Sequence, residues 1–203
     1  MRRIAIVVSL TLVAVLAAAQ LALPPLAENR VEDRLTDGGG TAEVSIDAFP
    51  AALLLLGDGD GLEVTGSDLD LDLDENPEVL ERLDGFDRVD MQLDDFRVGP
   101  FEVEDFVLSR DGSGPYSLIS SSTTTAAELA GYSANQLGFG GGPLLEFLAT
   151  GVEAAQRPIP IELDLQMESD EGRVQVVSGG GTVAGYPTGS LAELITSAIV
   201  VRV

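Results

Sequence analysis

The chain lacks four side chains on which much of protein chemistry depends. Its 203 residues contain no His, no Cys and no Trp, and all 11 basic residues are Arg, so Lys is absent as well. Without His and Cys there is no Ser-His-Asp triad, no thiolate nucleophile, no disulfide and no zinc site built from these ligands. Without Lys there is no Schiff base and no Walker-type phosphate loop. Carboxylates, hydroxyls, Arg side chains and the backbone remain.

Positive charge is also scarce. The 11 Arg residues stand against 34 Asp and Glu, which gives a formal net charge of -23 at pH 7. Phosphate backbones are bound through Lys and Arg, so this balance argues against a nucleic-acid partner. Two carboxylates facing a cleft would suffice for glycoside hydrolysis, but aromatic residues, which commonly line sugar sites, make up only 5% of the chain. We therefore predict a protein that is not an enzyme and uses no cofactor.

The N-terminal segment combines a positive start with a long uncharged run. Two Arg residues precede Ile4–Leu23, which holds 20 residues without a charge and includes three consecutive small residues at Ala17–Ala19. This pattern is typical of a secretory signal peptide cleaved before Gln20, and the run is also long enough to span a bilayer as an anchor. We predict that residues 1–23 are a signal peptide or membrane anchor, and that the rest is exported to the cell envelope or the extracellular face of the membrane.

Apolar and polar residues alternate through most of residues 24–203. This period of two predicts half-buried strands, and the lack of a long polar linker predicts a single domain. The strand with Tyr116, Leu118 and Ser120 in alternation turns polar through Ser121, Ser122 and Thr123. The alternating apolar positions are Val44 and Ile46; Leu62 and Val64; Leu69, Leu71 and Leu73; Val89, Met91 and Leu93; Phe101 and Val103; Tyr116 and Leu118; Ile159, Ile161, Leu163, Leu165 and Met167; and Val174 and Val176.

A few helices accompany these strands. A break at Pro24-Pro25 is expected to open a short helix that runs to Leu35 and carries a narrow apolar stripe. A second helix is expected at Thr124 or Thr125, where Glu128 suits a reciprocal cap. Strands with a few helices give an α+β fold class with an antiparallel sheet.

The octet Phe49–Leu56 is apolar on every side and ends at Gly57. It is too short to span a membrane. Two interpretations stay open: a short helix or strand packed in the core, or a short helix at the mouth of an apolar cavity. The surplus of Leu, Val and Ile leaves the same choice for the whole interior, which is either a filled core or a channel for acyl chains.

The acidic run Asp68, Asp70, Asp72, Asp74 raises the question of calcium. An EF-hand loop needs a glycine at its sixth position, and counting from Asp70 places Glu75 there. The alternation of this run with Leu residues favours a solvated face of a strand. We predict no metal site.

The order of these features resembles the LmeA-like phospholipid-binding family of actinobacterial envelope proteins. After the N-terminal segment comes the helix Leu26–Leu35, and then Val44–Pro50, which looks like the family's strand ending in Gly-Phe-Pro, with Ala48 in place of Gly. Leu53–Gly57 looks like its short apolar helix and glycine, and Ser122–Leu129 is similar to its strand-to-helix junction. The resemblance covers roughly residues 24–130, and the glycine-rich stretch beyond departs from the pattern.

The resemblance implies a tubular lipid-binding fold, in which a long curved antiparallel sheet wraps a helix and encloses a groove for acyl chains. It implies a protein that binds phospholipid or another acyl lipid, and that could transfer it, without catalysis. We predict that the protein is a monomer. An Arg at the mouth would offset repulsion of anionic headgroups by the net charge; the candidates are Arg30, Arg34 and Arg97. The alternative is a membrane-anchored structural or interaction module of the envelope with a filled core and no ligand. The predicted groove-lining residues are Phe49, Leu53, Leu54, Leu56, Leu69, Leu71, Leu73, Met91, Leu93 and Leu129.

Overall fold

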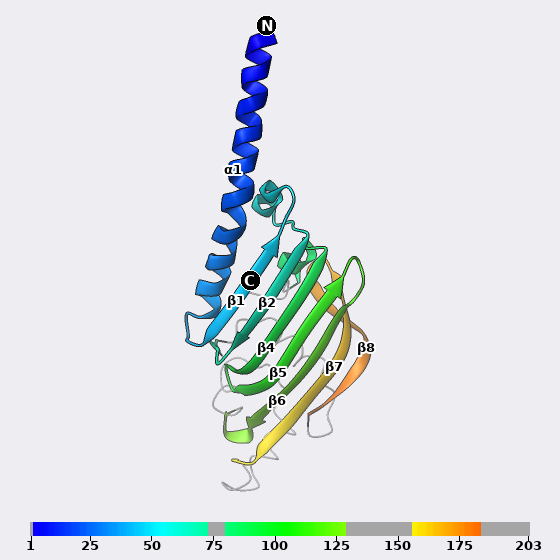
Figure 1. The fold of residues 1–203 in the computed structure, drawn as a ribbon. Coiled ribbons are helices and arrows are strands. Elements are labelled where there is room, and N and C mark those ends of the chain that lie inside the picture. Colours follow the sequence, from blue (N-terminus) through cyan, green and yellow to red (C-terminus); the bar gives the residue numbers. More distant parts are fainter. Residues whose placement is uncertain (1, 73–79, 129–155, 184–203) are drawn as a thin grey trace.

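The computed structural model describes residues 2–72, 80–128 and 156–183, and these form an α+β fold with one large sheet (Figure 1). The described elements, in chain order, are α1 (Arg2–Leu35), β1 (Thr41–Asp47), the 3₁₀ helix η1 (Ala51–Leu56), β2 (Gly61–Ser67), β3 (Asp70–Leu71), α2 (Glu81–Asp84), β4 (Arg88–Val98), β5 (Phe101–Asp111), β6 (Tyr116–Thr125), β7 (Pro158–Asp170) and β8 (Arg173–Val183).

The sheet contains eight of these strands in the order β1-β2-β4-β5-β6-β7-β8, with β3 paired to β4. Most neighbours are antiparallel, as the alternation predicts. The exceptions are β2–β4 and β3–β4, which pair in parallel. A parallel pair requires the chain to cross back before the second strand, and here α2 lies within that return. The predicted antiparallel sheet is therefore confirmed for most of its strand pairs and corrected for these two.

Helix α1 is continuous from Arg2 to Leu35 and includes both prolines of Pro24-Pro25. The predicted break is thus wrong. Two prolines remove only two N–H donors from the helix, and contacts with β1 and η1 support α1 around this point. The predicted stripe is confirmed, because Val31 and Leu35 are buried and Ala27 packs against the core. Among the residues whose side chains are described, no helix is long and apolar enough to cross a membrane.

The lower half of α1 covers the free edge of β1 (Figure 1). The backbone N–H of Val44 donates to Glu32 Oε1 at 3.1 Å, and that of Ile46 donates to Glu28 Oε1 at 2.9 Å. The spacing of Glu28 and Glu32 along the helix matches the spacing of Val44 and Ile46 along the strand, because four helical residues rise about 6 Å and two strand residues about 6.7 Å. Two carboxylates on one helix face thereby satisfy the amides that an edge strand would otherwise leave unpaired.

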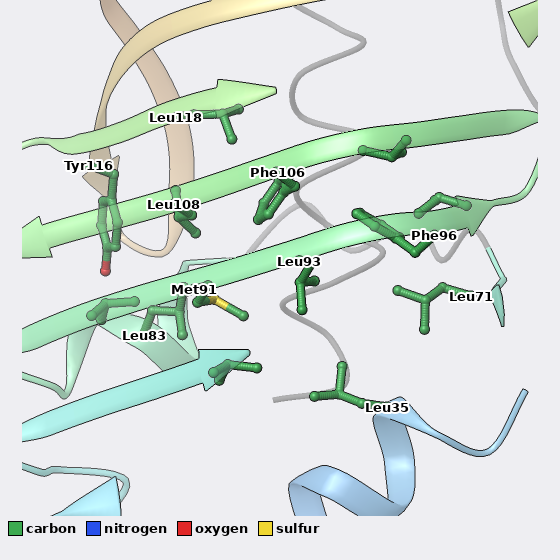
Figure 2. Close-up of a cluster of buried hydrophobic side chains, with 14 of the residues drawn as sticks. Leu35, Leu71, Leu83, Met91, Leu93, Phe96, Phe106, Leu108, Tyr116 and Leu118 are labelled. Atoms are coloured by element: carbon green, nitrogen blue, oxygen red, sulfur yellow. The ribbon is translucent and has the colours of Figure 1, made fainter. Parts of the chain in front are cut away.

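One face of the sheet, here called the inner face, holds the buried side chains. Leu35 of α1 and the apolar residues of the strands point into this space together (Figure 2). The cluster extends over every strand from β1 to β7, which is the result that the period-two pattern predicts for a sheet with one covered face. The sheet is strongly twisted and curves toward β8 (Figure 1).

The alternation of buried and exposed side chains contains one extra exposed residue in each of three neighbouring chain segments, and these three places lie beside one another across the sheet. Each slip occurs at a doublet ending in Asp, and the three doublets are Ser67-Asp68, Asp94-Asp95 and Glu104-Asp105. They lie side by side: Asp68 N–H donates to Asp95 O at 3.1 Å, and Asp94 pairs with Asp105. Asp68 and Asp95 adopt positive φ angles of 56° and 48°, a region that Asp tolerates better than most residues. We call this line across the sheet the crease.

The crease keeps the apolar face continuous. A shift of one residue exchanges the two faces of a strand, so each extra residue returns the next apolar side chain to the inner face. The side chains returned in this way are Leu69, Phe96 and Phe106, and all three are buried. The pattern is readable in the sequence as a change from even to odd spacing, but alternation alone does not show that the three slips are aligned.

Candidate functional site

Four of the predicted groove-lining residues meet on the inner face. Leu69, Leu71, Met91 and Leu93 are each at most 1% exposed and belong to one cluster. Figure 2 shows Leu71, Met91 and Leu93 directed into the same space. Leu54 of η1 packs against this cluster from one side.

The remaining predicted lining residues lie elsewhere. Phe49 and Leu56 are both 77% exposed, and Leu53 is half-buried. The reason is the geometry of η1: residues three apart share one face of a 3₁₀ helix, so Ala51 and Leu54 pack inward while the other side faces solvent. Leu73 and Leu129 lie outside the described residues.

A row of hydroxyls interrupts the apolar inner face on β6. Ser120, Ser122 and Thr124 alternate with exposed or half-buried neighbours and are each at most 3% exposed. Thr124 Oγ1 donates to the carbonyl of Pro100 at 2.7 Å. In the described part of the chain, Ser120 Oγ and Ser122 Oγ are buried with no hydrogen-bond partner. We call these two the hydroxyl pair.

Apolar residues flank the hydroxyl pair on both sides. In the strand register, Ser120 lies between Phe106 and Leu163, and Ser122 pairs with Val103 and Ile161. A buried hydroxyl without a partner costs roughly 1–3 kcal/mol, and such groups are uncommon in folded proteins. The alternation of Tyr116, Leu118 and Ser120 is readable in the sequence, and the same even spacing extends this face to Ser122, although the polar run Ser121–Thr123 hides it.

The three predicted headgroup residues lie at the surface. Arg30 and Arg34 are on the exposed side of α1. Arg97 is on the outer face of β4, where its guanidinium lies 3.1 Å from Glu102 with 56% of its side chain exposed. The structure therefore does not bring these residues to the hydroxyl pair.

Arg97 lines a hollow of about 400 Å³ on the outer face at the crease. Most of the other polar lining residues are acidic, and the lining comprises Asp68, Leu69, Asp70, Asp95, Phe96, Glu102, Val103, Glu104 and Thr123. Among the described residues there is no group of three or more Asp or Glu placed to hold a metal ion. Asp68 and Asp70 of the acidic run are exposed and form part of this open surface.

A second polar cluster joins α2 to the sheet, at the end of the strands away from the crease. Arg110 Nη1 lies 3.2 Å from Asp84 Oδ1, and its guanidinium also donates to the carbonyls of Leu83 and Phe86. Tyr116 OH donates to Asp84 Oδ1 at 2.9 Å, and Ser169 donates to the other carboxylate oxygen. The Arg110 guanidinium stacks 4.6 Å from the centre of the Tyr116 ring. We call Asp84, Arg110, Tyr116 and Ser169 the clamp, because they connect α2, β5, β6 and β7.

The clamp predicts a loss of stability at high pH. Burial raises the pKa of the Tyr116 hydroxyl above its ordinary value near 10; Arg110 opposes this shift and Asp84 adds to it. Since the folded pKa is the higher one, this stabilisation is complete below about pH 10 and is lost as the pH rises above it. Tyr116→Phe should flatten the decline measured by urea unfolding between about pH 8 and 11. Tyr132 and Tyr186 remain in both proteins, so equal slopes in both would contradict the assignment.

Comparison with protein-family models, with curated proteins and with solved structures finds no match.

Proposed function

We propose that this protein binds an acyl lipid, without catalysis, on the inner face of its sheet, in the manner of a tubular lipid-binding protein. The observation that supports this most directly is the hydroxyl pair. Two donors directed into an apolar interior, with no hydrogen-bond partner among the described residues, suit a ligand that is mostly hydrocarbon and has a few oxygen acceptors. The ester carbonyls of a phospholipid have this chemistry.

The energetics agree with such a ligand. Each CH₂ of an acyl chain contributes about 0.8 kcal/mol on leaving water, so affinity for the lipid does not depend on a charged side chain that binds the headgroup. Hydrogen bonds to Ser120 and Ser122 would fix the position of the chains and relieve the cost of their unpartnered hydroxyls.

The surroundings of the hydroxyl pair favour binding over chemistry. A serine nucleophile needs an adjacent base, and the chain contains no His. The strand neighbours of Ser120 and Ser122 on β5 and β7 are all apolar. We therefore assign both residues a role in holding the ligand. The uncharged N-terminal segment supports the further proposal that the domain is exported and held at, or released near, the membrane of the cell envelope.

Replacing both serines by alanine tests this function through two effects of opposite sign. Ser120→Ala with Ser122→Ala removes two unsatisfied hydroxyls, so the lipid-free protein should gain about 1 kcal/mol in free energy of unfolding. Affinity for a phosphatidylcholine with a fluorescent acyl chain should fall roughly tenfold, which corresponds to about 1.4 kcal/mol. Urea unfolding and fluorescence titration of the full chain in detergent measure the two effects.

Ser121→Ala is the matched control. Ser121 is on the same strand but on the outer face, where its hydroxyl contacts Asp105 at 3.2 Å, so both quantities should stay near wild type. Native mass spectrometry of the purified chain should also detect copurified phospholipid. A wild-type chain that carries no lipid and binds none would contradict the proposal.

A second candidate is a membrane-tethered interaction module with a filled core. It is favoured by the near-complete burial of the inner face, where the side chains from β2 to β7 in the cluster are at most 4% exposed. The two candidates separate in the same experiment, since a filled core predicts the gain in stability while neither the wild type nor the variant binds the lipid.

A further inference from the structure

Three large apolar side chains protrude from the segment around η1. Phe49, Leu55 and Leu56 are 77%, 73% and 77% exposed. Single exposed apolar residues are normal on protein surfaces, whereas several at one place mark an interaction site. We call these three residues the apolar tip.

The apolar tip is held firmly against α1. The side-chain amide of Gln20 donates to the carbonyl of Ala48 at 2.8 Å and accepts from the N–H of Ala51 at 2.8 Å. Figure 1 shows η1 beside α1 at the level where the helix leaves the body of the protein. The tip therefore has a fixed height along α1, close to residue 20.

The helix next to the tip is also apolar on its surface. Val13, Val15, Leu16 and Leu21 are between 47% and 80% exposed. The tip and this part of α1 thus lie together at one end of the molecule, away from the inner face of the sheet.

Charge is excluded from this end and concentrated just behind it. The sequence has no charged residue from Ile4 to Leu23, nor between Asp47 and Asp58. Behind the tip, Asp60 Oδ2 accepts the N–H of Phe49 at 2.6 Å, and Asp47 lies close to Arg88. Carboxylates are costly to move into hydrocarbon, so they set a limit on how deeply this end could enter an apolar phase.

We propose that the apolar tip inserts into the surface of a phospholipid bilayer beside α1, as a second membrane contact. A helix from Ile4 to Gln20 is roughly 25 Å long, compared with about 30 Å for the hydrocarbon core of a bilayer. If Ile4 lies at one boundary of the hydrocarbon core and α1 crosses the core, Gln20 and the tip lie near the other boundary, where acyl chains meet headgroups. This is the depth at which interfacial apolar side chains bind.

The expected headgroups are zwitterionic. The segment from Asp47 to Asp60 contains no Lys or Arg, and the chain has a net charge of -23. Binding to anionic lipid by electrostatic attraction requires a cluster of basic residues, so the contact must come from apolar insertion. This proposal rests on the proposed membrane attachment of the N-terminal segment and is independent of whether the inner face binds lipid.

The absence of Trp allows a clean test. Phe49→Trp places the chain's single Trp in the tip, and Ile119→Trp places it on the outer face of β6, where Ile119 is 53% exposed. The full chain of each variant is reconstituted into phosphatidylcholine vesicles with or without bromine on the acyl chains. We expect the Phe49→Trp emission to shift to the blue and to be largely lost with brominated lipid, while Ile119→Trp emission is unchanged.

Two results would overturn the proposal. One is equal quenching of both variants by acrylamide in the aqueous phase, together with no effect of brominated lipid on Phe49→Trp. The other is a blue shift that depends on protein concentration and not on vesicles, which would assign the tip to contact with a second copy of the chain. Leu55→Ser with Leu56→Ser in the Phe49→Trp background should weaken the bromine effect, and unchanged circular dichroism would show that the fold is retained.

Discussion

Asp84→Asn is expected to lower the free energy of unfolding by about 3 kcal/mol, because it leaves the buried Arg110 without its opposite charge. The Arg110 side chain is only 9% exposed, and Asp84 also accepts hydrogen bonds from Tyr116 and Ser169. The loss should be measurable by urea or thermal unfolding at neutral pH. The same change should loosen α2 from the sheet, since the clamp supplies its polar contacts with β5, β6 and β7.

A double-mutant cycle separates the ion pair from simple damage to the fold. Adding Arg110→Met to Asp84→Asn removes the unpaired charge, so the double variant should regain part of the stability lost by Asp84→Asn alone. Glu102→Gln is the control, because its pair with Arg97 is exposed at the surface and such pairs contribute at most about 1 kcal/mol. If Glu102→Gln and Asp84→Asn lower the free energy of unfolding equally, the buried ion pair of the clamp stabilises the fold no more than the exposed pair does, which would contradict the prediction.

Glu28→Ala with Glu32→Ala is expected to cost about 3 kcal/mol, from two hydrogen bonds with charged acceptors at about 1.5 kcal/mol each. The amides of Val44 and Ile46 lose their acceptors in this variant. An unpaired edge is also a template for association between chains, so the double variant should form oligomers more readily. Urea unfolding and size-exclusion chromatography measure the two consequences.

Glutamine at the same two positions is the matched control. Glu28→Gln with Glu32→Gln keeps an acceptor oxygen at each site, so most of the stability should be retained and the chain should stay dispersed. If the Gln and Ala variants are equally unstable, the charge of these carboxylates, and not their role as acceptors for β1, would be the stabilising factor.

Local pattern predicts much of this fold. The strands around Val44, Val64 and Leu163 follow from alternation, and Thr125 forms the predicted reciprocal cap with Glu128: Thr125 N–H donates to Glu128 Oε2 at 3.0 Å and Glu128 N–H to Thr125 Oγ1 at 3.1 Å. These features depend on residues near one another in sequence. The three glycines Gly179, Gly180 and Gly181 belong to β8, because pairing with β7 overrides the weak strand preference of Gly.

What the sequence does not predict depends on contacts across the sheet. The parallel pairing of β2 with β4 requires knowledge of the path between them, and the clamp joins Asp84 to Ser169 across 85 positions. The candidate site is similar: the apolar members of the inner face follow from periodicity, whereas the isolation of the hydroxyl pair depends on which residues of β5 and β7 lie beside β6. The exposure of Phe49 and Leu56 depends on how η1 seats against α1, which an octet of uniform hydrophobicity does not indicate.

The crease has a consequence for how such a sheet can change over evolutionary time. Deleting one residue from a single acidic doublet would turn the rest of that strand inside out, with its carboxylates facing the core. The neighbouring segments of the crease would still carry the extra residue, so the deletion would leave a mismatch between them, unlike the border with β6, where a bulge between Val103 and Asp105 takes up the extra residue of β5. The three doublets therefore depend on one another, and we expect this region to tolerate substitution within them better than insertion or deletion.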